Sequence, residues 1–181
     1  MELHPDFLPR EQTCCFTGHR VVAARVREDV IAAVDRHIME LYHAGYRYFL
    51  AGGALGFDML AEWEVLRAAR FDSDIKLILI LPCRDQTARW KDMPGSLENL
   101  RQYKQLLGKA DAVHYITDFY TDTCMRERNR YMVDHSSACI AYYNGYPRSG
   151  AGQTFRMAED DGLLLYNVRD EIKALYESAK N

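Results

Sequence analysis

Short apolar segments alternate with longer amphipathic segments along the whole chain, and this alternation constrains the fold more than any other feature. Several of the short segments are apolar at every position, which is typical of parallel strands covered on both faces. Strand-sized runs cover residues 13–18, 46–53, 76–82, 112–116, 138–144 and 163–167. Helical spacing covers residues 23–44, 58–71, 97–109, 123–136, 152–161 and 169–179. The pattern predicts an α/β three-layer sandwich around a mostly parallel sheet.

The chain contains no repeat, low-complexity tract or Pro/Gly-rich linker, so we expect one domain over residues 1–181. Its 26 acidic and 23 basic residues give a net charge of −3, which argues against a nucleic-acid partner. No apolar run approaches the roughly 18 residues that span a bilayer, and residues 1–12 lack the apolar core of a signal peptide. We therefore expect a cytoplasmic protein without a membrane partner.

The five cysteines carry no metal-binding pattern, because none forms a C-x-x-C pair with histidine partners. Three of them lie in strongly apolar runs, where a reduced cysteine behaves as a small hydrophobic residue. We expect all five to be thiols and expect no metal site. Cys83 stands apart, because it follows Pro82 at a predicted strand end.

Polar and turn-forming residues follow the predicted strands, at the edge of the sheet where α/β proteins bind ligands. The segments at these ends are Thr17-Gly18-His19-Arg20, Gly52-Gly53, Pro82-Cys83-Arg84 and Asn144-Gly145. Glycines, small hydroxyls, amides and arginines recur there, which is the chemistry that an anionic, sugar-bearing ligand requires. Thr17, Gly18, His19 and Arg20 are candidate ligand contacts, although Thr17 and Gly18 can also serve only as a turn and His19 as a helix cap.

The stretch AGGALGFDMLAE over residues 51–62 places three glycines between a strand and a helix. Gly52 and Gly53 can bring backbone N–H groups to a phosphate, and Gly56 can be purely structural. The spacing matches neither the dinucleotide fingerprint nor the P-loop, so neither mechanism is assigned. Asp58, in the first helical turn, would repel a phosphate, and it fits a ribose hydroxyl or a helix cap better.

Two further segments contain candidate contacts. Gln86 and Trp90 are four residues apart and share one face if the segment is helical, so they can meet a base, or Trp90 can cover a strand end. In MRERNRYMVD we assign Arg128 and Asn129 to the inward face, because neighbouring arginines cannot all face one site. Asp134 can orient an arginine or cap the turn.

The last glycine-rich loop, SGAGQT over residues 149–154, opens a helix that we expect to begin near Gly152. Its backbone N–H groups and hydroxyls can bind a phosphate. The candidate contacts in this region are Asn144, Gly150, Gly152 and Thr154.

Together the motifs TGHR, GGALGFDMLAEW, LPCRDQTARW, RNRYMVD and YYNGYPRSGAGQTFRMA resemble the YpsA-like branch of the SLOG superfamily. The resemblance runs from residue 14 to about residue 160 and implies a bacterial protein with a Rossmann-like fold. It also implies a pocket for a nucleotide-derived ligand such as an ADP-ribose or NAD-like molecule, without a further cofactor. SLOG relatives often pair, so the resemblance is compatible with a homodimer.

The same superfamily includes LOG enzymes, which cleave a base from a nucleoside monophosphate, and DprA proteins, which bind single-stranded DNA. Arg128 stands where LOG enzymes have an arginine, but Asn129 replaces their lysine, and SGAGQT lacks their P-G-G-x-G-T-x-x-E run. We therefore favour a binding or sensing domain over an N-glycoside hydrolase. Catalytic candidates for the hydrolase are Arg128, Asp58, Asp134 and Glu159. Net acidity counts against the third reading, a single-stranded DNA binder.

Overall fold

The structure is a computed structural model that describes residues 3–91, 93 and 95–179. These residues form one six-stranded sheet in the order β4-β3-β2-β1-β5-β6, and every neighbouring pair of strands is parallel. The strands are β1 (Thr13–Gly18), β2 (Tyr48–Ala51), β3 (Lys76–Cys83), β4 (Ala112–Thr117), β5 (Ala138–Tyr142) and β6 (Leu164–Asn167). The predicted Rossmann-like α/β sandwich is confirmed.

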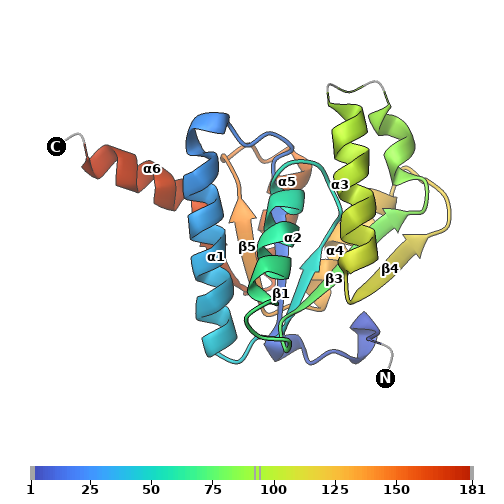
Figure 1. The fold of residues 1–181 in the computed structure, drawn as a ribbon, viewed down its shortest axis with the longest axis horizontal. Helices are drawn as coiled ribbons and strands as arrows, with labels where there is room; N and C mark the ends of the chain where they lie inside the picture. The colour runs from blue at the N-terminus through green and yellow to red at the C-terminus, as the bar shows by residue number, and fades with distance from the viewer. Residues whose placement is uncertain (1–2, 92, 94, 180–181) are drawn as a thin grey trace.

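Helices cover both faces of the sheet (Figure 1). One layer contains α1 (Arg27–His43), α2 (Phe57–Ala68) and α3 (Ser96–Lys109), and the opposite layer contains α4 (Cys124–Asp134) and α5 (Gly150–Asp160). The last helix, α6 (Val168–Ser178), begins beside α1 and projects away from the body. Short 3-10 helices cover Pro5–Phe7, Arg10–Gln12, Ala24–Val26 and Gln86–Trp90.

Two hydrophobic clusters, one on each face of the sheet, account for the continuous apolar runs in the strands. Phe16 and Phe49 face α1 and α2, whereas Leu50 and Ile78 face the layer formed by α4 and α5. All four side chains are fully buried. Alternate residues of each strand thus enter opposite clusters, and only a strand that is apolar on both faces satisfies both.

The predicted element boundaries differ from the observed ones by a few residues, for local reasons. The first helix begins at Arg27, because Ala24–Val26 forms a separate 3-10 turn. The helix expected from about Gly152 begins at Gly150, because the Ser149 side chain accepts a hydrogen bond from the Gly152 amide and caps the helix. β5 ends at Tyr142, two residues before the predicted end.

The order of the strands fixes where the sheet can bind a ligand. The chain builds outward from β1 to β4 and then returns to place β5 beside β1. The loops after β1 and β5 therefore diverge to opposite faces and leave a crevice at their carboxyl ends.

All five cysteines are free thiols and buried. In the described part of the chain, no helix is long and apolar enough to cross a membrane.

Candidate functional site

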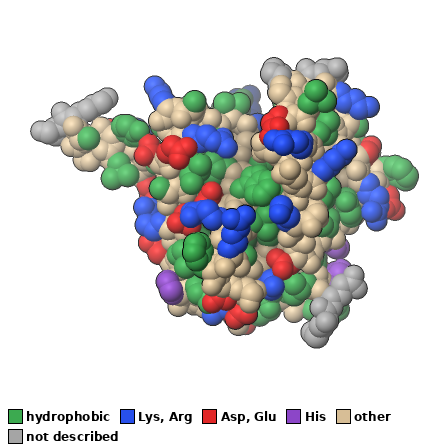
Figure 2. All heavy atoms as spheres, viewed as in Figure 1, with side chains coloured by type: hydrophobic (Ala, Val, Ile, Leu, Met, Phe, Trp, Pro, Cys, Tyr) green, Lys and Arg blue, Asp and Glu red, His purple; other side chains and the backbone are tan. Residues whose placement is uncertain are grey.

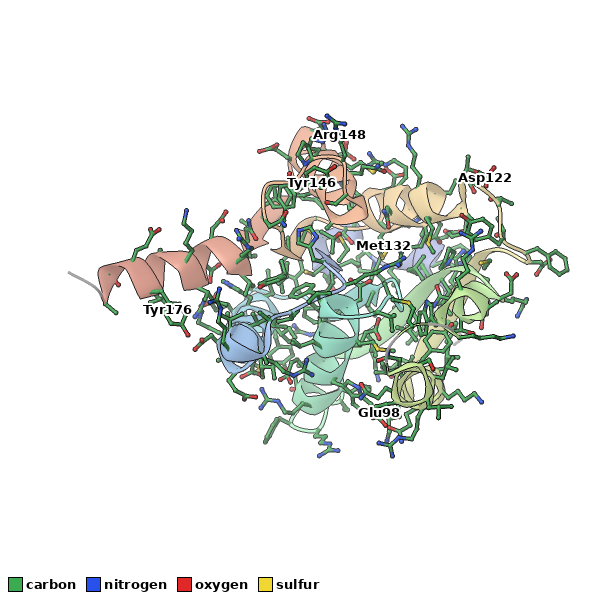
Figure 3. All side chains as sticks on the ribbon, turned by 90° about the horizontal axis from the view of Figure 1, so that it is seen from above. Glu98, Asp122, Met132, Tyr146, Arg148 and Tyr176 are labelled. Carbon is green, nitrogen blue, oxygen red and sulfur yellow. The ribbon has the colours of Figure 1, made fainter. Side chains whose placement is uncertain are left out.

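A cleft of about 660 Å³ opens at the carboxyl ends of β1 and β5, within the size range of small-molecule sites. Among the predicted contacts, those that line it are Thr17, Gly18, His19, Arg20, Asp58, Gln86, Trp90, Arg128, Asn129, Asn144 and Gly150. Residues from several loops and from α4 therefore converge on one opening. Figure 3 looks onto this edge of the sheet and shows Met132 of α4, a lining residue, between the two helical layers.

The cleft is cationic although the chain is acidic overall. Three arginines line it, Arg20, Arg128 and Arg169, whereas Asp58 is its one carboxylate among the described residues. Arg20 and Arg169 form no ion pair with any described residue. On the face formed by α1, α2 and α3, by contrast, basic and acidic side chains are mixed (Figure 2). Arg169 was not identified from the sequence, because it lies at the start of the last predicted helix rather than in a glycine loop.

The N-terminus of α5 supplies free backbone donors to the cleft. Ser149, Gly150 and Ala151 line the cleft, and the Ser149 hydroxyl already accepts from the Gly152 amide at 2.9 Å. Within the described structure, the amides of Gly150 and Ala151 donate to no acceptor. Two unpaired N–H groups at the positive end of an 11-residue helix form an anion-binding geometry.

The end of β1 holds its candidate residues in fixed positions. A Cβ atom on Gly18 would lie 2.4 Å from the Phe57 ring, so glycine allows α2 to approach the strand. The His19 Nε2 atom accepts a hydrogen bond from the Asn144 amide at 3.1 Å and ties the β1 and β5 loops together. Burial lowers the pKa of His19, with a smaller contribution from Arg169. A neutral His19 thus orients the loop, and Arg20 supplies the charge.

In this structure the glycine loop after β2 contacts protein groups. The Gly53 amide donates to Glu62 at 3.0 Å, and neither Gly52 nor Gly53 lines the cleft, so their contact with a phosphate stays a prediction. A Cβ on Gly52 would lie 1.5 Å from Arg128 Nη1. Gly56 adopts φ +85°, and its Cβ would lie 2.2 Å from the Arg20 carbonyl oxygen. These glycines make room for neighbouring groups.

Two buried carboxyl groups and one guanidinium lie beneath the cleft. Arg128 Nη1 donates to the Gly52 carbonyl at 2.7 Å and lies 3.9 Å from Asp58 Oδ2. Burial raises the pKa of Asp58 to about 6, although Arg128 and the amides of Ala54 and Gly52 oppose the shift. Burial and the nearby Asp58 raise the pKa of Glu62 well above its ordinary value. The charged form of Glu62 is therefore disfavoured, and Asp58 ionises near pH 6.

Glu62 was not identified from the sequence, although a signal for it exists. It follows Asp58 by four residues, the spacing that places two side chains on one face of a helix. Its Oε1 atom accepts from the Gly53 amide, and its Oε2 atom is buried without a hydrogen-bond partner in the described structure. A buried glutamate such as Glu62 is difficult to predict from sequence, because most glutamates in folded proteins are exposed to solvent.

The amide and aromatic candidates line the cleft from two elements, the 3-10 helix Gln86–Trp90 and α4. Gln86 and Trp90 lie in the same 3-10 helix and are 5% and 6% exposed. Gln86 Nε2 donates to the Gly53 carbonyl, and the Trp90 ring packs edge-on against Tyr103. Both side chains are thus held rigidly from behind. Asn129, also buried, forms no side-chain hydrogen bond with another described residue.

Besides Gly52 and Gly53, four further predicted site residues lie outside the cleft. Gly152 and Thr154 are buried within α5, where the Thr154 hydroxyl donates to the Gly150 carbonyl. Asp134 is exposed and pairs with Arg130 at 2.6 Å, and Glu159 is exposed near the end of α5. Of the three carboxylates considered for catalysis, only Asp58 lines the cleft.

We expect Asp58→Asn to stabilise the protein above pH 6. Folding favours the neutral form, because the pKa of Asp58 is about 6 in the folded protein against an ordinary 3.8. The wild-type protein therefore loses stability as pH rises through about 6, by roughly 1–3 kcal/mol. Thermal unfolding at pH 4 and pH 8 measures this difference. The variant should unfold at the higher temperature at pH 8 and near the wild-type temperature at pH 4.

If Asp58→Asn unfolded at a lower temperature than the wild-type protein at pH 8, this would show that ionised Asp58 stabilises the fold. Glu64→Gln is the matched control on the same helix, because Glu64 pairs with Arg67 away from the cleft. It should show no stabilisation at pH 8. A carboxylate that weakens the fold is a candidate for a function, because ligand sites commonly carry such groups.

The sequence and the fold were compared with known proteins. The family model YpsA, described as the YspA SLOG family, matches residues 23–161. An uncharacterized SPbeta prophage-derived protein, YoqJ of Bacillus subtilis, is 29% identical over 67% of this chain and 73% of its own. The UPF0398 protein YpsA of Bacillus subtilis is 22% identical over 80% of this chain and 82% of its own.

Two solved structures of DNA processing protein A share the fold. The Streptococcus pneumoniae protein (DprA) has a TM-score of 0.59 and 15% identity over 86% of this chain, which spans 49% of that longer protein. The Helicobacter pylori protein, whose structure is described by its single-stranded DNA binding mode, has a TM-score of 0.57. It is 18% identical and is matched over 93% of this chain and 82% of its own. At these identities the likeness establishes the fold.

The expectation that nucleic acid is an unlikely partner was wrong. It rested on the net charge of −3, yet proteins of the same fold process DNA, and one of them binds single-stranded DNA. Net charge averages over the whole surface, whereas binding depends on the local field. In this chain the averaging conceals a cleft in which Arg20 and Arg169 form no ion pair with a residue that the structure describes.

Proposed function

The chain belongs to the YpsA family of SLOG proteins, and from this premise we propose that its cleft binds a nucleotide-derived ligand through the phosphate groups. One observation carries the proposal. The amides of Gly150 and Ala151, at the N-terminus of α5, share the cleft with Arg20 and Arg169, and none of these four groups has a partner among residues 3–91, 93 and 95–179. Helix N-termini and guanidinium groups both bind phosphate in proteins, the first through backbone N–H groups and the second through paired hydrogen bonds.

The other half of the cleft has the chemistry to hold a nucleoside. Trp90, Leu55 and Met125 offer apolar surface for a base, and Gln86 and Asn129 add amide groups to the lining of the same cleft. A volume of about 660 Å³ accommodates a molecule the size of ADP-ribose or NAD. These features favour a nucleotide over a simple inorganic anion.

Binding without turnover is the expected behaviour. Cleavage of an N-glycosidic bond requires a carboxylate that stabilises the developing positive charge or activates water. Asp134 and Glu159 lie outside the cleft, and Arg128, which lines it, is a cation and donates to the Gly52 carbonyl. Incubation with AMP, ADP-ribose or NAD followed by chromatography should return the nucleotide intact. Released base would replace the binding function by a hydrolase with Asp58 as its carboxylate.

We expect the double variant Arg20→Ala/Arg169→Ala to lose most of its affinity for ADP-ribose. Each hydrogen bond to a charged group contributes about 1.5–3 kcal/mol, so affinity should fall by about 100-fold or more. Isothermal titration calorimetry measures the loss, and thermal shift checks it independently. Arg25→Ala is the control, because Arg25 is exposed and lies outside the cleft. Unchanged affinity in the double variant would remove both arginines from the site.

Single-stranded DNA is the second candidate ligand. The likeness in fold to DNA processing protein A favours it, as do the unpaired arginines at the cleft. Fluorescence anisotropy with a labelled oligothymidylate tests it, and a strong decrease of affinity with salt is expected for phosphate contacts. Competition by ADP-ribose would place both ligands in the same cleft. Absence of oligonucleotide binding at low salt would remove this candidate.

A further inference from the structure

We propose that Asp58 selects a ribose, so that the ligand of the cleft is a ribonucleotide whose sugar hydroxyls donate to this carboxylate. The inference rests on the proposed function and adds the class of sugar to it. The placement of Asp58 carries it, because Asp58 is the one carboxylate among the described residues that line a cleft with three arginines. A carboxylate in that position repels phosphate and attracts a hydroxyl donor.

The free amides belong to α5 and Arg169 opens α6, both on the β5 and β6 side of the cleft. Arg20 and Arg128 lie nearer to Asp58, because the Arg20 backbone packs against Gly56 and Arg128 Nη1 is 3.9 Å from Asp58 Oδ2. Asp58 belongs to α2 and lies on the β2 side with Gln86 and Trp90. A nucleotide that places its phosphate at α5 and its base at Trp90 has its sugar between them, in reach of Asp58.

The Asp58 carboxylate is held rigidly in this position. Arg128 Nη1 lies 3.9 Å from Asp58 Oδ2 and is itself fixed to the Gly52 carbonyl. A Cβ atom on Gly52 would come within 2.9 Å of the same carboxylate oxygen, so the loop leaves just enough space for it. Glu62 supports the loop from beneath through the Gly53 amide. A carboxylate that is fixed in this way loses little entropy when it accepts a hydroxyl.

The ionisation of Asp58 makes the preference depend on pH. The groups that act on it are Arg128 of α4 and Glu62 of α2, and Arg20 acts in turn on Arg128. The Cys139 thiol of β5 also interacts electrostatically with Asp58. This thiol remains neutral, because its pKa is raised well above the ordinary value. The charged carboxylate, which accepts hydroxyl hydrogen bonds most strongly, exists above pH 6. The ribose preference should therefore be largest at pH 8 and weaken as pH falls through about 6.

The test compares 5′-AMP with its 2′-deoxy and 3′-deoxy analogues on the full chain by calorimetry. At pH 8 the wild-type protein should bind AMP about tenfold or more tightly than at least one analogue, the expected contribution of a charge-assisted hydrogen bond. At pH 5 the ratio should approach one. Ratios are compared because the phosphate titrates near pH 6 in all three compounds, and its effect cancels.

Two variants complete the test. Asp58→Asn preserves the shape and should bring the ratio at pH 8 close to one, whereas Glu64→Gln on the outer side of α2 should leave it at the wild-type value. Equal binding of AMP and both analogues to the wild-type protein overturns the ribose inference and leaves the phosphate site intact. Absence of binding by all three compounds, and by ADP-ribose, overturns the proposed function and the inference with it.

Discussion

Arg128→Ala is expected to unfold at a temperature about 6–12 °C below the wild-type protein and to show no stabilisation by ADP-ribose. The guanidinium is 8% exposed, donates to the Gly52 carbonyl and faces Asp58. Its removal leaves a buried carbonyl and a buried carboxylate without their cation, which costs about 3 kcal/mol. For a domain of this length, that loss corresponds to the expected shift in unfolding temperature. Differential scanning fluorimetry with and without ligand measures both effects.

Arg126→Ala is the matched control for this prediction. Arg126 lies two residues earlier in α4, is exposed and lines no part of the cleft. Its replacement should change stability by less than about 0.5 kcal/mol and leave the response to ADP-ribose unchanged. If Arg128→Ala were as stable as this control, the buried contacts of Arg128 would not support the loop. If it still responded to ADP-ribose, Arg128 would not shape the site.

Gly56→Ala is expected to destabilise the fold by about 3 kcal/mol or more. A Cβ at this position would lie 2.2 Å from the Arg20 carbonyl oxygen and 2.3 Å from the Arg20 carbonyl carbon. Both are backbone atoms, so the β1 loop itself must shift to relieve the overlap. The residue also adopts φ +85°, where a non-glycine residue is strained by about 1–3 kcal/mol. Chemical denaturation measures the change in the free energy of unfolding.

Gly45→Ala is the control that measures the backbone strain of a positive φ without a steric overlap. Gly45 adopts φ +102°, but no heavy atom lies within 4 Å of its Cβ position. This control should lose only about 1 kcal/mol, the conformational part of the effect. Equal losses in the two variants would show that the Arg20 loop moves freely away from Gly56. That result would contradict the close packing between the β1 and β2 loops on which the cleft depends.

The fold could be predicted from the sequence because its strands are apolar on both faces. Runs such as residues 76–82 and 138–144 tolerate only a position between two helical layers, and the structure places them in β3 and β5. Parallel strands also share one carboxyl edge, so the position of the ligand cleft at that edge could be predicted as well. The order of the strands does not, because the return of the chain to pair β5 with β1 depends on contacts far apart in the sequence.

The site could be predicted in outline, but not the function of each residue. The position of Arg128 among three arginines follows from helix geometry, and the structure buries it while Arg126 is exposed. A glycine that frees an amide for a ligand and one that makes room for a side chain look alike in sequence. In this structure a Cβ on Gly52 would overlap Arg128, and the Gly53 amide donates to Glu62, so both glycines contact protein groups and their contact with a phosphate stays a prediction.

Backbone amide chemical shifts measured during a titration with ADP-ribose test the central claim most directly, because they report on each candidate donor separately. The account predicts that the Gly150 and Ala151 amides, which have no acceptor in the described structure, show the largest changes. Gly45 and Gly162, which lie outside the cleft, should show none. A titration that leaves Gly150 and Ala151 unshifted at saturating ADP-ribose would contradict a phosphate site at the N-terminus of α5.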